Sequence, residues 1–499
     1  MTTTPGVASG YAFVKSAEDR NTDGDVSATV ERSSLYQTMQ RNPNAGYRLM
    51  LVSDTFSPQV NGVVTTIKNL IAFCQRLGLE VDIIEPSQFM NVGFPIYPEV
   101  RLCINMWHVG IRLCEFRPHA VHIFTEGPLG VSARVFCGGR NIPFTTSYHT
   151  RFPEYLHALV GLPVSVSYPF LRWFHAEAQS CLVPTPTVRA ELTHRFGPAS
   201  KLYNWTRGVD ISTFDMELRR QEAWREIEDL VRIKATGRKI LLWVGRISRE
   251  KNVEEFCELG EEFGAKVLVG DGPIRPKMEA KYGKTVHFAG FKRGRDLALY
   301  YAAADVFVFT SKTDTFGNVM IEAMACGTPV AAFPVTGPID VVEHGVTGFI
   351  HPKFNDDEPD GVSLGASIRS CLTLSPDDVA RRCQEVWTLD AMGRIFVDNL
   401  VVLEHPEDRF KMRRKKHKIN YWTALLALII YRLYMDSGLE SHQRFGPGSK
   451  SSLAIPEKPA KPENEEEKKA ATQTLWSVWS SVIMTIYLLS VIPQMSSFG

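Results

Sequence analysis

Two kinds of hydrophobic pattern alternate along the chain from Tyr47 onward. Short runs that are apolar almost throughout, such as YRLMLVSD (47–54) and LEVDII (79–84), are typical of strands covered on both faces of a sheet. Between them, in 62–78, apolar residues recur at the three- and four-residue spacing of a helix that ends at Gly78. This alternation predicts parallel β-α-β units.

The same alternation restarts after WTRGVD (205–210), where KILLWVG (239–245) begins a second series of strands and helices. The chain is therefore predicted to be an α/β protein with two tandem, doubly wound, Rossmann-like domains, 47–205 and 206–400, facing a cleft. Ligands bind at the carboxyl ends of parallel strands, so this cleft is the expected ligand site. Residues 1–46 are predicted to be a disordered lead.

The composition changes after about residue 400. A basic stretch runs into an apolar one in 409–434, which predicts a segment at a membrane interface. A polar linker, 447–474, precedes an apolar run of 18 residues at 475–492. At about 1.5 Å per residue this run spans roughly 27 Å, close to a bilayer's hydrocarbon core, so a C-terminal transmembrane tail is predicted. The alternative is a pair of amphipathic helices packed on the two domains.

Charge and cysteine usage exclude some classes of function. The net charge of the 499 residues is +1, which argues against a dedicated nucleic-acid-binding protein. The nine cysteines are scattered and form no C-x-x-C pair, so we expect neither a disulfide framework nor a zinc site. This usage of cysteine is typical of a protein in a reducing compartment. The N-terminal segment lacks the apolar stretch of a secretory signal, and its acidic residues disfavour a transit peptide.

Two acidic residues, Asp314 and Glu322, lie eight positions apart around the start of a predicted helix, 318–326. Asp314 falls in the loop before this helix, where a carboxylate either caps the helix or contacts a ligand. Capping does not explain Glu322, which lies too deep in the helix. A carboxylate at this edge of a parallel sheet accepts hydrogen bonds from two hydroxyls, as on a ribose, so ligand binding and a structural role are both open for Glu322.

Two cations, Arg246 and Lys251, follow a predicted strand end and precede a helix. An arginine fork and a lysine point charge suit a diphosphate at such a position. The alternative is a solvated basic loop, which a second strand-end site in the same domain makes less attractive. Asn61 and Gly62 follow the first strand, where the N–H of Gly62 approaches a phosphate or the residues form a plain tight turn.

No motif indicates a nicotinamide dinucleotide, a catalytic triad or a metal site. Neither the loop 53–66 nor VGDGPIR (269–275) has the spacing G-x-G-x-x-G. His149 follows a predicted strand end and could face the cleft. A lone histidine is more often structural than catalytic, and its aromatic and basic neighbours Tyr148 and Arg151 raise the share of the functional alternative. No Ser-His-Asp arrangement and no His-x-x-x-His pair is present.

Taken together, these segments resemble glycosyltransferase family 4, whose members have the GT-B fold. The resemblance covers about residues 47–400. It is carried by the ordered motifs NGVVTT, SYHTRFPEY, RGVD, VGRISREKN, VGDGP, TDTFGNVMIEAMACGTPVAA and GPIDVVEHGVTGF. Each motif alone is weak, whereas their order and spacing together are specific. The chain is similar to GDP-mannose-dependent α-mannosyltransferases and to sulfolipid-making sulfoquinovosyltransferases, both of which glycosylate lipids.

The resemblance implies a role for each charged candidate. Glu322 would hold the ribose hydroxyls of a nucleotide-sugar donor. Asp314 stands at the first acid of the family's E-x7-E motif and, with its shorter side chain, would contact the hydroxyls of the donor sugar. Arg246 and Lys251 would stabilise the charge that develops on the leaving diphosphate. His149 would contact the donor sugar near the reacting carbon.

The remaining candidates would act mainly through their backbones. Gly62, with Asn61 beside it, would approach the diphosphate through its N–H group. Phe316, Gly317 and Asn318 would lie beside the sugar and diphosphate, with their amides at the start of a helix. The first domain would then bind the acceptor and the second the nucleotide sugar.

The implied activity is retaining transfer of a hexosyl group from a nucleotide sugar, with GDP-mannose favoured, to a membrane lipid or glycolipid. The basic stretch before the first tail segment resembles the sulfoquinovosyl branch instead. Diacylglycerol glycosylation from UDP-sulfoquinovose or UDP-glucose therefore stays an alternative, as does a soluble sugar or polysaccharide acceptor. A scaffold that only binds nucleotide sugars is disfavoured, because the chain has a matching residue at each position that the family uses to contact the phosphate, the ribose and the sugar.

We expect no cofactor and no metal, since Arg246 and Lys251 can neutralise the diphosphate. The expected partners are the donor, the acceptor and a membrane surface that the C-terminal segments contact. The motif RGVD (207–210) would lie at the domain junction. The protein is expected to be membrane-associated, with both catalytic domains on the cytosolic side and a single C-terminal anchor.

Overall fold

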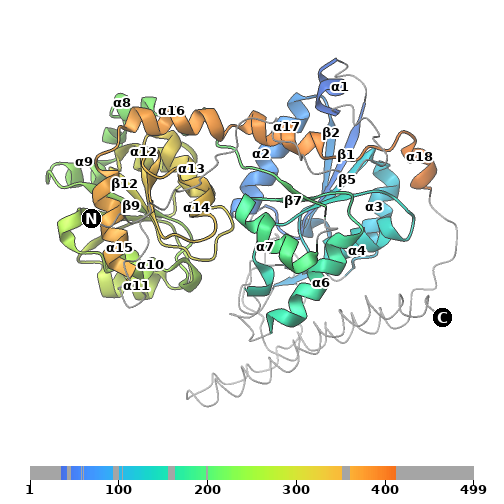
Figure 1. Ribbon diagram of the computed structural model, residues 1–499, viewed down its shortest axis with the longest axis horizontal. Helices are drawn as coiled ribbons and strands as arrows, with labels where there is room; N and C mark the ends of the chain where they lie inside the picture. The colour runs from blue at the N-terminus through green and yellow to red at the C-terminus, as the bar shows by residue number, and fades with distance from the viewer. Residues whose placement is uncertain are drawn as a thin grey trace, which may run out of the picture.

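The computed structural model has two lobes joined along one edge (Figure 1). It describes residues 35–41, 46–57, 59, 61–93, 101–103, 105–154, 163–197, 201–350 and 360–411. Each lobe contains a six-stranded sheet whose strands are all parallel. The prediction of two tandem Rossmann-like domains is therefore confirmed.

The N-terminal sheet has the strand order β2-β1-β5-β6-β7-β8. Its strands are β1 (Arg48–Val52), β2 (Glu80–Ile84), β5 (Ala120–Ile123), β6 (Thr145–Ser147), β7 (Cys181–Val183) and β8 (Leu202–Asn204). In β1, Leu49 and Leu51 join the core on one face, and Met50 and Val52 join the core on the other. Because both faces are covered by helices, this strand is apolar throughout, as its pattern predicts.

Helices cover both faces of this sheet. The described helices of the domain are α1 (Leu35–Arg41), α2 (Gly62–Arg76), α3 (His108–Phe116), α4 (Pro128–Gly138), α6 (Val164–Ala176), α7 (Pro186–Phe196), α17 (Leu389–Asp398) and α18 (Pro406–Arg409). A small antiparallel pair, β3 (Asn91–Gly93) and β4 (Arg101–Cys103), lies outside the main sheet. Helices α1, α2 and α17 share one core, and α3 and α4 contribute to the core on the opposite face.

The C-terminal sheet has the strand order β11-β10-β9-β12-β13-β14. Its strands are β9 (Ile240–Val244), β10 (Ala265–Val269), β11 (Val286–Gly290), β12 (Val306–Phe309), β13 (Val330–Ala332) and β14 (Gly348–Phe349). Ile240 and Leu242 enter the core on one face, and Leu241 and Trp243 enter the core on the other. The strand order reverses between β9 and β12, which makes their carboxyl ends the expected ligand site.

Helices also cover both faces of the second sheet. They are α8 (Glu217–Arg220), α9 (Glu228–Lys234), α10 (Val253–Cys257), α11 (Arg275–Tyr282), α12 (Gly294–Ala303), α13 (Asn318–Ala325), α14 (Pro338–Val341), α15 (Asp360–Cys371) and α16 (Pro376–Val386). Short 3-10 turns are η1 (Pro86–Gln88) in the first domain and η2 (Ala223–Glu226), η3 (Arg249–Lys251) and η4 (Glu261–Phe263) in the second.

The chain crosses between the domains twice, at neighbouring positions. The first crossing follows β8 and the second follows α16, which Figure 1 shows leading into α17 along one edge of the molecule. Val209 in the first crossing forms a parallel bridge with Thr388 in the second. A Cβ atom on Gly208 would lie only 2.5 Å from the Thr388 carbonyl oxygen, so this approach requires glycine.

After the second crossing, α17 packs on the first domain rather than on the second. Met392 and Phe396 are buried in the core that α2 and β1 share, and Trp205 Nε1 donates to the Met392 carbonyl at 2.9 Å. The predicted second domain, 206–400, therefore includes a helix that completes the first. A helical pattern shows that a helix has an apolar face but not which sheet that face will cover.

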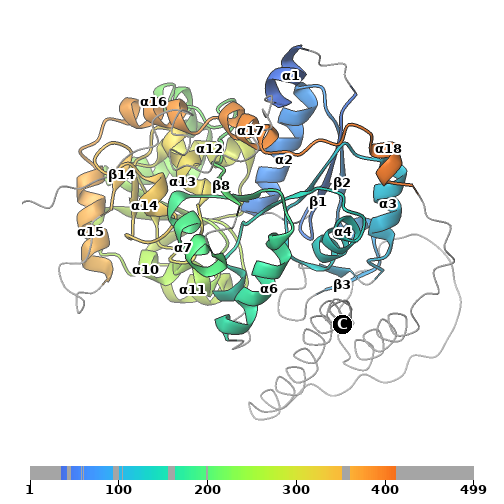
Figure 2. The same cartoon turned by 45° about the vertical axis from the view of Figure 1, so that its right-hand side comes forward.

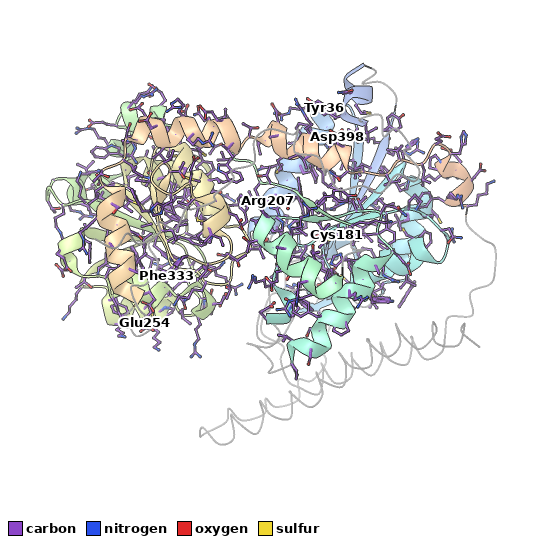
Figure 3. All side chains as sticks on the ribbon, in the orientation of Figure 1. Tyr36, Cys181, Arg207, Glu254, Phe333 and Asp398 are labelled. Carbon is purple, nitrogen blue, oxygen red and sulfur yellow. The ribbon has the colours of Figure 1, made fainter. Side chains whose placement is uncertain are left out.

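Part of the predicted disordered lead is ordered, because 35–41 forms α1. Tyr36 stacks on Phe73 with ring centroids 6.3 Å apart, and Met39 is fully buried. The Tyr36 N–H donates to Asp398 Oδ1 at 3.2 Å, and Figure 3 shows these two residues together. The prediction of disorder is wrong for this stretch, because its partners come from distant parts of the sequence.

The segments predicted to contact a membrane lie almost wholly outside the described residues, the last of which is Lys411. In the part of the chain that the structure describes, no helix has the length and apolar character needed to cross a bilayer. The predictions for 409–434 and 475–492 therefore stay predictions.

Candidate active site

Charged side chains gather at the carboxyl ends of β9 and β12, where the order of the C-terminal sheet reverses. Arg246 follows β9, and Lys251 ends the 3-10 turn η3 in the same loop. Asp314 lies in the loop after β12. The structure therefore brings three of the predicted residues to one edge of the sheet, as expected for a switch-point site.

Lys251 and Asp314 form an ion pair at this edge. Lys251 Nζ lies 2.5 Å from Asp314 Oδ1, and about a quarter of each side chain is exposed, 27% and 24%. Thr310 Oγ1 donates to the Lys251 carbonyl at 2.9 Å and accepts from Trp243 Nε1 at 3.0 Å. These bonds tie the β9 loop to the end of β12. An ammonium has three N–H donors, so Lys251 can keep Asp314 and still donate to phosphate oxygens.

Glu322 lies on α13, behind the loop that carries Asp314. Its carboxylate Oε2 accepts a hydrogen bond from the buried Tyr301 hydroxyl of α12 at 3.1 Å. Burial raises the pKa of Glu322 to about 7, and the Tyr301 hydrogen bond opposes this effect. The carboxylate thus titrates near neutral pH, which a group with no role beyond capping would not need. Sequence reasoning did not identify Tyr301, because nothing in its helix marks it from other buried aromatic residues.

Among the described residues, no side chain caps the first N–H groups of α13. Gly317 is the N-cap, with φ 91°, and it offers no side-chain oxygen to the first turn. A Cβ atom there would lie 2.9 Å from Met320 Cε and 3.0 Å from Phe309 Cζ. The left-handed backbone and the close packing both favour glycine. This arrangement suits the predicted use of backbone amides toward an anion.

The ring of Phe316 lies in the core of the C-terminal domain rather than at its edge. It is 4% exposed and meets Trp387 edge to face at a centroid distance of 5.3 Å. Of the residues predicted to lie beside the sugar and diphosphate, Phe316 therefore presents only its backbone. The side chain of Asn318 reaches the other domain.

Across the interface, the loop after β1 meets the start of α13. Asn61 caps α2, its Oδ1 accepting from the Val64 N–H at 3.0 Å. Asn318 Nδ2 donates to the Gly62 carbonyl at 3.2 Å. The two loops predicted to contact the donor from opposite domains are thus in direct contact. A Cβ atom on Gly62 would lie 3.5 Å from Asn318 Nδ2, an ordinary contact, so packing in this structure does not by itself require glycine there.

His149 touches the second domain through its backbone. Its carbonyl accepts from Thr315 Oγ1, the neighbour of Asp314, at 2.6 Å. Its ring is turned inward: Nδ1 lies 3.1 Å from Arg207 Nη2, and Nε2 lies 2.7 Å from Ser147 Oγ. Burial, and then the Arg207 charge, hold the pKa of His149 well below its usual range. The ring is therefore a neutral imidazole with both nitrogens occupied.

Two further contacts join the domains beside this site. Arg151 Nη2 donates to Thr336 Oγ1 at 3.0 Å while pairing with Glu191 at 2.5 Å. Thr187 Oγ1 donates to Asp340 Oδ1 at 3.0 Å. Sequence reasoning missed these threonines, since a lone hydroxyl carries no pattern, although Asp340 lies within the motif GPIDVVE.

Comparison with known proteins agrees with this geometry. A family model described as Glycosyltransferase Family 4 matches residues 60–213, and one described as Glycosyl transferases group 1 matches residues 238–361. The chain belongs to glycosyltransferase family 4. One model thus matches each domain, and the first match includes the first crossing.

Curated relatives of this glycosyltransferase include two that are named for transferring different sugars. A GDP-mannose-dependent alpha-mannosyltransferase of Mycobacterium tuberculosis is 28% identical over 341 residues, 64% of this chain and 88% of that protein. A sulfoquinovosyl transferase of Arabidopsis thaliana is 27% identical over 317 residues, 58% of this chain and 61% of that protein. Among solved structures, sucrose-phosphate synthase from Thermosynechococcus elongatus aligns with a TM-score of 0.52 and 21% identity, covering 78% of this chain and 98% of that one. That likeness shows the GT-B fold.

Proposed function

We propose that this transferase moves a hexosyl group, with retention of configuration, from a nucleotide sugar to a membrane lipid or glycolipid, and that GDP-mannose is its favoured donor. The observation that carries the proposal is the cluster on the C-terminal domain. Lys251, in the loop that also holds Arg246, pairs with Asp314 of the loop after β12, and Glu322 lies on the helix that follows Asp314. This set supplies both cations for a diphosphate and carboxylates for sugar hydroxyls.

The two cations act on the leaving group. As the bond between the sugar and the diphosphate breaks, negative charge grows on the phosphate oxygen. Arg246 and Lys251 stabilise that charge more in the transition state than in the bound donor, which lowers the barrier. Because Lys251 is fixed by Asp314 and its loop is tied to Thr310, little reorganisation is needed when the charge develops.

The two carboxylates hold the donor in place. Asp314 accepts from hydroxyls of the sugar, and Glu322 accepts from hydroxyls of the ribose. Glu322 accepts hydrogen bonds best when it is ionised, which the pKa of about 7 makes dependent on pH. Holding the reacting carbon in line with an acceptor hydroxyl supplies the orientation that transfer requires.

The choice of donor rests on the relatives. The Mycobacterium tuberculosis relative is named for GDP-mannose and is covered more fully than the sulfoquinovosyl transferase of Arabidopsis thaliana. Transfer from UDP-sulfoquinovose is the second candidate, which the latter relative supports. We further propose that the acceptor lies against the N-terminal domain, at a membrane surface that the segments 409–434 and 475–492 contact, with both domains on the cytosolic side.

The test is transfer by the purified full-length protein. GDP-mannose, UDP-sulfoquinovose and UDP-glucose are offered separately with mixed membrane lipids, with chelator present. Glu322→Ala is assayed beside Glu343→Ala, which removes a partly buried acid of the same domain that pairs with Arg382. We expect mannose to enter a lipid fraction without metal, the Glu322 variant to lose this activity, and the Glu343 variant to keep it.

Other outcomes change the proposal in different ways. Turnover of only a UDP-sugar would reject GDP-mannose as the donor. Transfer only to a soluble sugar would reject the lipid acceptor. Loss of all turnover on adding chelator, restored by a divalent cation, would reject metal-independent catalysis.

A further inference from the structure

A continuous chain of buried hydrogen bonds runs from the first crossing into the N-terminal sheet. It begins at the guanidinium of the crossing arginine, which Figure 3 shows between the two lobes. Its members are, in order, Arg207, His149, Ser147, His122, Thr145 and the carbonyl of Val121. The chain therefore links the domain junction to β6 and β5, through a residue that also contacts the donor-binding domain.

The first half of the chain connects the crossing to β6. Arg207 Nη2 lies 3.1 Å from His149 Nδ1, and His149 Nε2 lies 2.7 Å from Ser147 Oγ. Arg207 Nη1 also donates to the Trp205 carbonyl at 2.9 Å, which fixes the guanidinium against its own crossing segment. The crossing segment thus holds one end of the chain rigidly.

The second half continues inside the sheet. Ser147 Oγ lies 3.1 Å from His122 Nε2, and His122 Nδ1 lies 2.7 Å from Thr145 Oγ1. Thr145 Oγ1 then donates to the Val121 carbonyl at 3.4 Å. A backbone carbonyl only accepts, so the chain ends there.

The arginine at the start and the Val121 carbonyl at the end together set the direction of the bonds between them. A guanidinium only donates, so His149 Nδ1 must accept and its proton must sit on Nε2. Ser147 then accepts from His149 and donates to His122 Nε2, which places the His122 proton on Nδ1. Thr145 Oγ1 accepts a hydrogen bond from the N–H of His122 Nδ1 and donates one to the Val121 carbonyl. His149 cannot take a second proton on Nδ1 without facing the guanidinium with another donor.

Burial agrees with this single arrangement. Ser147 and His122 are 0% exposed and Arg207 is 4% exposed. The ring of Phe124 stacks on His149 at 5.4 Å and meets His122 edge to face at 4.6 Å. Burial also lowers the pKa of His122 to about 3, so both imidazoles are neutral. In such apolar surroundings, aligned hydrogen bonds are strong and unpaired polar groups are costly.

We propose that Arg207 is a positioning residue of the transfer reaction, which fixes His149 as a neutral imidazole with its proton on Nε2. The His149 carbonyl accepts a hydrogen bond from Thr315, next to Asp314. The orientation of His149 therefore fixes how the loop that carries Asp314 lies against the first domain. The catalytic effect rests on the proposed function. The effect on the histidine does not.

The test uses full-length protein labelled with 15N in its histidine rings. Signals of His149 and His122 are assigned by their absence in His149→Asn and His122→Asn. We expect the wild type to show His149 unprotonated at Nδ1 and protonated at Nε2, unchanged from pH 6 to 8. Arg207→Lys keeps an obligate donor and should keep this pattern, whereas Arg207→Met should give mixed tautomers or a protonated ring.

Activity supplies the second readout. We expect kcat to fall by about 10- to 100-fold in Arg207→Met, with a smaller change in donor KM, because misplacement of the reacting groups is costly. Arg207→Lys should restore most of the rate. Arg134→Met is the matched control: Arg134 is 2% exposed, packs on Trp173 and pairs with Glu177, outside the chain of bonds. Its loss should lower stability and leave both the His149 signals and kcat unchanged.

Ser147→Ala tests the proposal if Arg207→Met does not fold. It cuts the chain beyond His149, so the His149 Nδ1 should stay unprotonated while His122 loses its fixed tautomer. A wild-type His149 with its proton on Nδ1 would overturn the proposal, as would an Arg207→Met protein with wild-type signals and rate. If no donor is turned over by any protein, the proposed function fails, and the ring signals still decide whether Arg207 sets His149.

Discussion

The two domains share a sheet architecture but use the carboxyl edge of that sheet differently. In the C-terminal domain, Lys251 and Asp314 lie at the edge with about a quarter of each side chain exposed. In the N-terminal domain, the corresponding polar residues turn inward. Asp54 follows β1 and accepts from the Leu129 N–H at 2.7 Å at the start of α4, and His149 is held in the buried chain of bonds. One edge presents partly exposed charged side chains, and the other uses its polar side chains for internal hydrogen bonds.

The comparison shows that position at a strand end does not by itself give a residue contact with a ligand. Asp54 and Asp314 both follow a central strand, yet burial raises the pKa of Asp54 to about 6 while backbone amides of α4 bond its carboxylate. His149, which follows β6, likewise turns its ring inward and contacts Thr315 of the second domain through its carbonyl. The following predictions test this division of roles.

The largest effect is expected for Lys251→Ala. Removing the ammonium leaves the charge on the leaving diphosphate partly unstabilised, so kcat/KM should fall by about 10²- to 10³-fold. Steady-state kinetics with the active donor measure this loss. Lys281→Ala is the control, because Lys281 is an exposed lysine of the same domain that pairs with Glu254. Equal losses in the two variants would contradict a specific role for Lys251.

Opposite outcomes are expected for the two aspartates. Asp314→Ala should lower kcat/KM by roughly 10- to 100-fold with little change in the free energy of unfolding, since its ion pair is partly exposed. Asp54→Ala leaves the Leu129 N–H and the Thr125 hydroxyl without their partner and should reduce the free energy of unfolding by about 1–3 kcal/mol. Urea unfolding and kinetics on each variant separate the two roles, and an active-site role for Asp54 would appear as lost activity at full stability.

The third prediction concerns pH and Glu322. Its pKa is raised to about 7, so the carboxylate becomes protonated as the pH falls through 7 and loses an acceptor for the ribose. Donor KM should rise by about tenfold for each unit below that pKa. Glu322→Gln, which cannot ionise, should bind the donor weakly at every pH. A donor KM in the wild type that is flat from pH 5.5 to 8 would contradict the assignment.

The same residue gives a prediction about stability with the opposite sign. The folded-state pKa of Glu322 is higher than its ordinary value of 4.5, so the native state binds more protons than the unfolded state between these values. The contribution of this group to the free energy of unfolding is therefore greatest at low pH and falls as the pH rises to 7. At pH 8, Glu322→Gln should be more stable than the wild type by roughly 1–3 kcal/mol. Thermal unfolding at pH 5 and 8 checks the sign.

The smallest effect is expected at the domain interface. Thr315→Val removes the hydrogen bond to the His149 carbonyl while keeping the side-chain shape. Loss of one such bond is worth about 1 kcal/mol, so donor KM should rise severalfold with little change in stability. Thr313→Val is the control, since its hydroxyl contacts the Glu250 carbonyl within the same domain at 3.4 Å. An equal rise in donor KM in both variants would show that the contact between the domains does not contribute to donor binding.

Sequence patterns predicted the sheets and the charged residues that gather at the edge of the C-terminal sheet, and for a physical reason. Strands such as β9 and β12 are short, apolar throughout and followed within three residues by a charged side chain, so local sequence determines both the strand and what its edge presents. Local breaks were harder to predict. The stretch 251–264 has the pattern of one helix, but the structure breaks it at Asn252, between η3 and α10, and at Gly260, which is extended and precedes η4.

The N-terminal half of the site could not be predicted in the same way. Whether His149 faces a ligand or the core depends on Arg207, which lies 58 positions away and arrives from the domain crossing. In the C-terminal domain, the Phe316 ring is buried against Trp387, which is also a contact between separate elements. Such pairings are set by how helices and strands meet in space, and neither residue type nor spacing encodes them.

The position of α17 also dictates the order in which the protein can be built. Met392 and Phe396 complete the core of the first domain, and Asp398 accepts a hydrogen bond from Tyr36, 362 positions earlier. On a ribosome, the N-terminal sheet emerges first but must wait for the whole C-terminal domain before its open apolar face is covered. The domain that is made first is finished last. A nascent chain that stalls before residue 389 would display that uncovered face, which makes it a natural client for chaperones that recognise exposed apolar surface.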